Sequence, residues 1–345
     1  MKINSILCAL VFLAFFACSE NDPVVDQENN QEPLIELEFR VSPIDLQGVE
    51  ANYAEDIPYD VFDKTKFDVF IPSSTEPTGL VIFIHGGGFT GGGKGFVYNN
   101  QELSDAVLEL LSNRIAVATI NYRLLVDGDT DGVLKCLNDS RRAVQYMRYI
   151  HNELNIDKNN IVLYGSSAGA ATSLWLATND DFKDPNNTDF VLQESSRVKG
   201  IALNATQSSL DIETRWLGDV FDEFGSTIDD VIELYGEARI YHFYGISTLE
   251  AYNTPEILTY RHQVDMLTML SADDPEIWVN NTGGHNNEPL TTGSFNHHPF
   301  HAKTIKEFAE AVGVPVVATY GNPILFTTPG NESYIEFLMR KLNEE

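Results

Sequence analysis

The stretch from Ile161 to Ala177 reads IVLYGSSAGAATSLWLA, and it decides the fold. Its first four residues are apolar and β-branched or bulky, which is typical of one buried strand. From Ala168 onward the stretch is rich in Ala, Leu and Trp, and this composition predicts a buried helix. Between strand and helix, GSSAG matches G-x-S-x-G in the strand, turn and helix context that a nucleophile elbow requires. A tight turn that merely contains a serine would give the same five letters, so a second motif is needed.

That second motif lies upstream, after a continuous apolar run at residues 80–84. Such a run indicates a strand that is covered on both faces. It leads into His85 and three glycines, which allow backbone N–H groups to converge on one point without side-chain obstruction. Acyl transfer needs donors aimed at a developing oxyanion. An HGGG loop and a G-x-S-x-G elbow, each at the end of a buried strand, together predict a serine hydrolase.

Strands alternate with helices along the rest of the chain. This order predicts an α/β fold with a mostly parallel central sheet and helices on both faces. The expected strands are an edge strand at 34–41 and further strands at 67–72, 80–84, 115–120, 161–164, 198–205, 276–279 and 314–318. Helices are expected at 136–152, with Arg141, Arg142 and Arg148 on its exposed face, and at 298–312 and 333–342.

A long helical segment separates the strands at 198–205 and 276–279. One crossover helix needs far fewer residues, so we expect a helical cap insertion at about 212–272. The segment is rich in tyrosine and phenylalanine, and these aromatic side chains either line a binding cleft or pack the cap onto the core.

From about residue 53 the chain resembles the α/β-hydrolase superfamily, in its HGGG-type carboxylesterase branch, and within it the Bacteroidetes-type feruloyl esterase-like hydrolases. Four motifs carry the resemblance: FDVFIP at 67–72, IHGGGFTGGGK at 84–94, NYRL at 121–124 and YGSSAG at 164–169. The resemblance implies hydrolysis of carboxylic esters through an acyl-serine intermediate, with small-molecule or glycan esters as substrates and no cofactor.

By the same resemblance Ser167 is the nucleophile, and the N–H groups of Gly87, Gly88 and Ala168 form the oxyanion hole. His85 then orients its loop and is not the base.

The base departs from the usual family pattern, which places a histidine after the last strand. No histidine follows His301, so the candidates after the 276–279 strand are His285, His297, His298 and His301. Some relatives carry a similar H-x-P pattern before the following helix, with His297 at the shared position. Pro299 suits a first helical turn, which leaves His297 in the preceding loop and makes it the first candidate.

A neutral imidazole activates serine when a carboxylate fixes its tautomer. Asp211, after the 198–205 strand, is the first candidate for this acid, Glu288 the second and Asp274 the third. Clustered histidines also suit a metal, but no matching acidic or cysteine cluster accompanies them, so we expect no metal.

The formal net charge is −29, from 22 basic and 51 acidic residues. Such a surface repels nucleic acid and anionic lipid, so nucleic acid is excluded as a partner and any membrane contact requires an anchor.

Residues 1–17 have the pattern of a lipoprotein signal peptide, with a lysine followed by a short apolar run that ends before Cys18. We expect Cys18 to carry the lipid anchor, which would place the protein in a bacterial cell envelope, at the outer membrane. Residues 18–40 are expected to form a flexible acidic tether, and 41–345 the hydrolase domain. After loss of the signal and lipidation, Cys136 remains alone, so no intrachain disulfide is expected.

Two other functions fit the same sequence. One is a non-catalytic binding lipoprotein that kept the fold and lost the active site, and the other is a serine peptidase, because both enzyme classes share the same catalytic groups. The sequence leaves the acyl group, the alcohol and the oligomeric state open.

Overall fold

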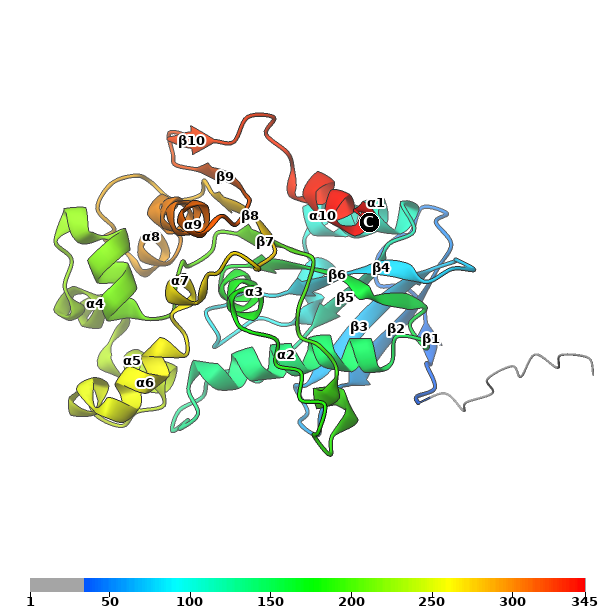
Figure 1. Ribbon diagram of the computed structural model, residues 1–345, viewed down its shortest axis with the longest axis horizontal. Helices are drawn as coiled ribbons and strands as arrows, with labels where there is room; N and C mark the ends of the chain where they lie inside the picture. The colour runs from blue at the N-terminus through cyan, green and yellow to red at the C-terminus, as the bar shows by residue number, and fades with distance from the viewer. Residues whose placement is uncertain (1–33, 345) are drawn as a thin grey trace, which may run out of the picture. The chain divides into compact units, whose positions relative to one another are not determined.

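The computed structural model describes residues 34–344 (Figure 1). The expected signal peptide, Cys18 and most of the acidic tether lie outside the described residues. Over 34–344, ten strands form one sheet in the order β1-β2-β3-β5-β4-β6-β7-β8-β9-β10. Their bounds are β1 Phe39–Arg40, β2 Ala51–Pro58, β3 Lys66–Pro72, β4 Thr78–Ile84, β5 Ala116–Ile120, β6 Ile156–Ser166, β7 Gly200–Asn204, β8 Glu276–Asn281, β9 Val316–Tyr320 and β10 Phe326–Thr327.

The centre of the sheet is parallel and its margins are antiparallel. The pairs from β5 through β4, β6, β7 and β8 to β9 all run parallel. β1, β2 and β3 join antiparallel at one margin, and β10 at the other. The prediction of a mostly parallel sheet from alternating strands and helices is confirmed.

Helices cover both faces of this sheet, and the side chains of β4 show how. Leu80, Ile82 and Ile84 share one apolar cluster with α2 (Val133–Tyr149), α3 (Ala168–Thr178) and α9 (Pro299–Val312). Val81 and Phe83 share a second cluster with α1 (Gln101–Ser112) and α10 (Tyr334–Asn343). Neighbouring residues of a strand point to opposite faces, so the five apolar residues 80–84 pack alternately into the two apolar clusters.

The segment between β7 and β8 forms a set of short helices, at the left of Figure 1. They are η3 Ile212–Val220, η4 Asp222–Phe224, α4 Ile228–Tyr235, α5 Glu237–Tyr244, η5 Leu249–Asn253, α6 Pro255–His262 and α7 Met266–Met269. Tyr244 packs edge-on against Tyr252 and Tyr260, whereas Tyr235 and Phe243 line a pocket. Some aromatic side chains of the cap therefore pack its interior and others line a pocket, so both interpretations from the sequence apply.

The first described residues differ from the expected edge strand at 34–41. Only Phe39–Arg40 pairs with β2, and Ile35 and Leu37 pack against the apolar core. The last part of the expected tether thus contacts the sheet. The remaining short helices are η1 Lys94–Val97, η2 Phe190–Gln193 and α8 Thr292–Asn296.

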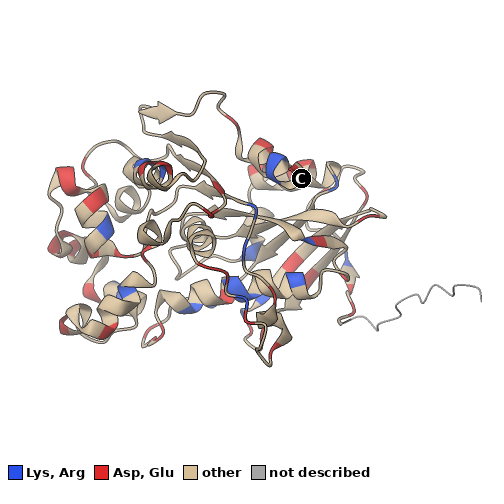
Figure 2. Cartoon of the chain, viewed as in Figure 1, with Lys and Arg blue, Asp and Glu red and all other residues tan. Residues whose placement is uncertain are grey.

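Acidic residues are spread over both the cap and the helices beside the sheet (Figure 2). None of the helices in residues 34–344 combines the length and apolar character needed to cross a bilayer. The thiol of Cys136 is free and buried, and burial raises its pKa to about 12, so it stays protonated at neutral pH.

Candidate active site

The carboxyl ends of four neighbouring strands bring the motif residues to one edge of the sheet. Ile84 of β4 pairs with Gly165 of β6, Ser166 with Asn204 of β7, and Asn204 with Asn280 of β8. From β4 the chain continues to β5 on one side of it and then to β6 on the other side, so the direction of strand order reverses at β4. Ligand sites of open α/β sheets lie at such a switch point.

Ser167 occupies the sharp turn between β6 and α3. Its φ of 53° and ψ of −119° are unusual for a residue with a side chain. The flanking glycines permit the turn, because a Cβ on Gly169 would lie 2.0 Å from the Ile84 carbonyl oxygen and one on Gly165 would lie 2.2 Å from the Gly169 carbonyl oxygen. The close approach of β4, β6 and α3 thus requires both glycines of the motif.

The structure brings His297 to this serine. Ser167 Oγ lies 2.8 Å from His297 Nε2, within hydrogen-bond distance. Burial lowers the pKa of His297 below its ordinary value of 6.5, so the ring is neutral at pH 7. A neutral ring that carries its proton on Nδ1 offers Nε2 as an acceptor for the serine proton.

The other three candidate histidines lie elsewhere. His298 is the N-cap of α9, where Nδ1 accepts from the N–H of Phe300 and Nε2 donates to the Asn287 carbonyl. His301 is fully buried; Nδ1 accepts from Ser208, Nε2 donates to the Phe295 carbonyl, and burial lowers its pKa to about 3. His285 is exposed in the loop after β8.

Both sides of His297 are anchored. Asn296 is held by Gln207, whose Nε2 donates to its carbonyl oxygen at 2.8 Å, and by Tyr235 of the cap, whose hydroxyl donates to its Oδ1 at 2.8 Å. On the other side, Asn281 donates to the His298 carbonyl oxygen at 3.1 Å. His297 is the C-cap of α8, and its N–H donates to the carbonyl oxygen of Gly293 in the first turn of that helix. The backbone that carries the imidazole is therefore held on both sides of His297.

The structure does not bring the first candidate acid to His297. The Asp211 carboxylate accepts hydrogen bonds from Arg261 and from the N–H of Thr214, and it caps η3. A buried carboxylate is stabilised by such a charged partner, and this ion pair joins the start of the cap to α6.

The other two candidate acids are also apart from the site. Asp274 lies before β8, at the amino end of a parallel strand, where it pairs with Arg197. Ser167 follows the carboxyl end of β6, so Asp274 and Ser167 lie at opposite ends of the parallel strands. Glu288 is exposed in the loop between β8 and α8. Over residues 34–344, no carboxylate is hydrogen-bonded to His297.

The glycine loop lies against the nucleophile turn. A Cβ on Gly86 would lie 2.8 Å from the Ser166 carbonyl oxygen, and Gly87 and Gly88 both have positive φ, at 103° and 57°. Over residues 34–344, the N–H groups of Gly87, Gly88 and Ala168 donate to no protein acceptor. Ala168 is also the first residue of α3, where the helix dipole favours negative charge. The loop and the helix end therefore offer donors for an anion.

His85 holds this loop from behind. Its ring stacks on Tyr122 at 4.3 Å, and Nδ1 donates to the Gly86 carbonyl at 2.7 Å. Burial lowers the pKa of His85 to about 4, so the ring is neutral at pH 7. The Tyr122 hydroxyl donates to the His85 carbonyl oxygen, which fixes the loop where it leaves β4.

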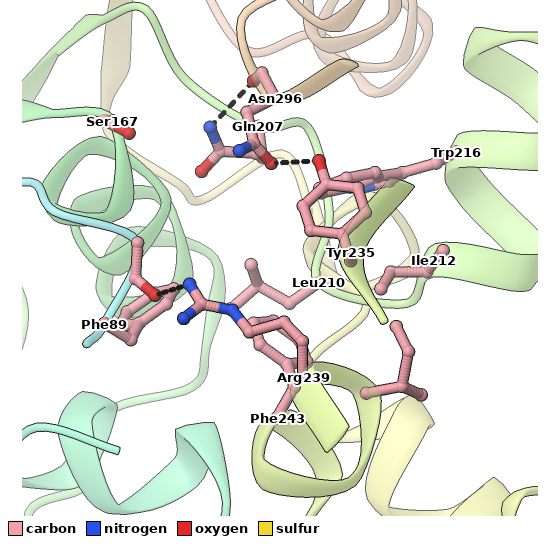
Figure 3. Close-up of a pocket in the computed structure, with 12 residues that line it drawn as sticks. Phe89, Ser167, Gln207, Leu210, Ile212, Trp216, Tyr235, Arg239, Phe243 and Asn296 are labelled. Carbon is pink, nitrogen blue, oxygen red and sulfur yellow. Dashed lines mark hydrogen bonds between the residues drawn. The ribbon is translucent and has the colours of Figure 1, made fainter. Parts of the chain in front are cut away.

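A small pocket opens beside Ser167 (Figure 3), with a cavity volume of about 50 Å³. Its walls come from the glycine loop, the loop after β7, the cap and α8: Gly88, Phe89, Ser167, Gln207, Leu210, Ile212, Trp216, Tyr235, Arg239, Ile240, Phe243 and Asn296. Three of its polar residues, Gln207, Arg239 and Asn296, were not identified from the sequence, whereas Tyr235 is one of the cap aromatic residues for which a binding cleft was one of two interpretations. Gln207 had one available signal, because a polar residue directly after a buried strand lies at the ligand edge of the sheet.

Among the described residues, no three His, Cys, Asp or Glu side chains are grouped closely enough to hold a metal ion. His297 contacts Ser167, and His301, one helical turn further on, contacts Ser208.

Residues 67–281 match the family model described as BD-FAE, which is more than half of the chain. The chain belongs to the BD-FAE family. The match includes the glycine loop and the Ser167 turn and ends before the loop that carries His297. The BD-FAE family consists of α/β-hydrolase-like esterases.

An arylesterase from Saccharolobus solfataricus is 33% identical over 113 residues, which is 31% of this chain and 33% of the arylesterase. The chain thus matches about a third of the length of that curated relative.

Several solved structures share the fold. A truncated carbohydrate esterase from gut microbiota has a TM-score of 0.60 at 14% identity, over 86% of this chain and 98% of the other. An acetyl ester-xyloside bifunctional hydrolase from Caldicellulosiruptor lactoaceticus has a TM-score of 0.50 at 19% identity, over 85% and 82% of the two chains. The butyrate-bound esterase Est2 of Thermogutta terrifontis has a TM-score of 0.51 at 16% identity, over 87% and 95%. Identities this low support the α/β-hydrolase fold alone.

Proposed function

We propose that this BD-FAE chain hydrolyses carboxylic esters with Ser167 as nucleophile and His297 as general base. The contact of Ser167 Oγ with His297 Nε2 at 2.8 Å carries the proposal. A serine on a strained turn, a neutral imidazole at its hydroxyl and three unused N–H groups nearby are the parts that acyl transfer requires.

The reaction follows from these parts. His297 Nε2 takes the hydroxyl proton as Ser167 Oγ bonds to the ester carbonyl carbon, and the N–H groups of Gly87, Gly88 and Ala168 stabilise the oxyanion. The carbon–oxygen bond to the alcohol then breaks, and His297 returns the proton to the leaving alkoxide. Water, deprotonated by His297, hydrolyses the acyl-serine and releases the acid.

The pocket favours short acyl groups. Its volume of about 50 Å³ corresponds to a few water molecules, each of which needs about 10–15 Å³ in such a cavity. Its wall is mostly apolar, and Leu210, Ile240 and Phe243 are among the residues that line it. Small acyl esters, free or attached to a glycan, suit this pocket, as the names of the esterase relatives also suggest.

The two alternatives receive less support. A binding protein has no need to keep a serine and a neutral histidine at hydrogen-bond distance. A peptidase that recognises a substrate amine needs a carboxylate in its pocket, and the pocket beside Ser167 is lined by none.

The test is a panel of acetyl, butyryl and feruloyl esters assayed with the purified protein and with Ser167→Ala. We expect turnover of the acetyl and butyryl esters by the wild type and a loss of about three or more orders of magnitude in the variant. Turnover that survives in Ser167→Ala at an unchanged melting temperature would refute the assignment.

We also propose, from the sequence of the first 18 residues, that Cys18 is lipidated and holds the enzyme in the cell envelope. In a bacterial host, Cys18→Ala should move the protein from the membrane fraction to the soluble fraction. A protein that still sediments with membranes after this change would point to another anchor.

A further inference from the structure

The pocket beside Ser167 differs in charge from the rest of the protein. The chain has 51 acidic and 22 basic residues, yet the twelve residues that line the pocket include one arginine and no carboxylate. Arg239 is therefore the charged side chain that a bound substrate meets there.

Arg239 projects from α5 of the cap across the pocket toward the glycine loop (Figure 3). Its Nη2 donates to the Gly88 carbonyl oxygen at 2.5 Å, and its Nη1 donates to Thr90 Oγ1 at 2.7 Å. Both acceptors are neutral. A guanidinium group has five N–H donors, so these two contacts leave others unused and the positive charge uncompensated.

Other arginines of the cap are paired with acids. Arg215 bonds to Asp265, and Arg261 bonds to Asp211. Over residues 34–344, Arg239 forms no ion pair, and burial lowers its pKa. A partly buried charge without a counter-ion costs free energy, so its retention beside a nucleophile indicates that a ligand supplies the counter-ion.

We propose that Arg239 binds a free carboxylate of the substrate, so that the preferred substrates are esters that carry a second, ionised carboxyl group. This inference rests on the proposed ester hydrolase function and specifies its substrate class. Arginine suits the role because its planar group binds carboxylates through two parallel hydrogen bonds. Gln207 and Asn296, on the opposite side of the pocket, offer further polar groups to the same ligand.

The carboxylate can belong to the acyl part or to the alcohol part of the ester, and two matched substrate pairs separate these sources. Monoethyl succinate is compared with ethyl butyrate, in which a methyl group replaces the carboxylate of the acyl chain. 4-Acetoxybutanoate is compared with butyl acetate, in which a methyl group replaces the carboxylate of the alcohol. Acid release at constant pH gives kcat/KM for all four esters.

In the wild type, we expect the charged member of one pair to have a kcat/KM about 10- to 100-fold above its neutral partner, as a hydrogen-bonded charge pair would provide. Arg239→Met should abolish that preference, and Arg239→Lys should keep part of it. Lys183→Met, which removes an exposed positive charge after α3, is the matched control and should keep the full preference. High salt should weaken the preference, because it screens the charge pair.

Two results would overturn the inference while ester hydrolysis stands. One is turnover of the neutral esters with no preference for the charged member of either pair. The other is an equal loss for charged and neutral esters in Arg239→Met, which would make Arg239 a positioning residue for the glycine loop. If the wild type hydrolyses none of the four esters and a fluorophosphonate does not label Ser167, the proposed function itself fails, and this inference fails with it.

Discussion

The Tyr235 hydroxyl, on the cap, donates a hydrogen bond of 2.8 Å to Oδ1 of Asn296, the residue directly before His297. The cap therefore contacts the segment that carries His297, the proposed base, and it also forms a wall of the pocket. Tyr235 also lines the pocket, with its hydroxyl directed at Asn296 (Figure 3).

Removal of that hydroxyl should slow the reaction. Tyr235→Phe loses the hydrogen bond to Asn296, worth about 0.5–1.5 kcal/mol, and a longer contact with the Thr292 carbonyl oxygen, so we expect kcat to fall about 2- to 10-fold with little change in melting temperature. Tyr241→Phe is the matched control, because Tyr241 lies half-buried on α5 and its hydroxyl donates to Glu237. An unchanged kcat in Tyr235→Phe would show that the base does not depend on the cap.

Alanine variants of the four candidate histidines should separate catalysis from stability. His297→Ala should lower kcat by about three or more orders of magnitude with little loss of stability. His301→Ala should mainly lower the melting temperature, because His301 is buried and uses both ring nitrogens. Near-normal activity of His297→Ala, with loss of activity in another of the four, would reassign the base.

The Asp211–Arg261 pair should act on stability. Both side chains are buried, at 3% and 5% exposure, and breaking a buried pair costs about 3–5 kcal/mol. Asp211→Asn and Arg261→Met should therefore lower the free energy of unfolding to a similar extent, measured by urea denaturation. An Asp211→Asn variant of unchanged stability with kcat reduced a thousandfold would instead make Asp211 the partner of His297.

The pH dependence of kcat/KM should report the burial of His297. The imidazole must be neutral to accept the serine proton, and burial holds its pKa below 6.5. Activity should therefore be lost only as the pH falls below that value, with the inflection of the acidic limb under pH 6.5. An inflection at or above 6.5 would show that His297 lacks this shift or is not the base.

Local patterns predicted the parts of the site that depend on backbone geometry. The glycines around Ser167 and after His85 are needed where strand, turn and helix meet, so their spacing marks the turn and the donor loop in the sequence. Pro299 lies in the first turn of α9 and His298 is its N-cap, as expected, and this leaves His297 before the helix, beside Ser167. These signals lie within a few residues of the group that they position.

Contacts between distant segments carried no such signal. Asp211 suited an acid role by its place after β7, but its partner Arg261 comes 50 residues later in the cap. Arg148 was wrongly expected on an exposed helix face; it is 5% exposed and donates to the carbonyl oxygens of Lys158 and Arg197. Arg239 reaches the site only because α5 folds back over the glycine loop. Tertiary packing determines each of these positions, and the periodicity of a single helix does not predict contacts with distant segments.

The most direct test of the account is to identify the residue that a fluorophosphonate modifies. Mass spectrometry of the intact protein should show one adduct, and peptide mapping should place it on Ser167, because its hydroxyl lies at hydrogen-bond distance from the neutral imidazole of His297. Ser167→Ala should remain folded and unlabelled, and His297→Ala should be labelled far more slowly. An adduct on Ser166, or labelling that persists in Ser167→Ala, would contradict the central claim that Ser167 is the nucleophile.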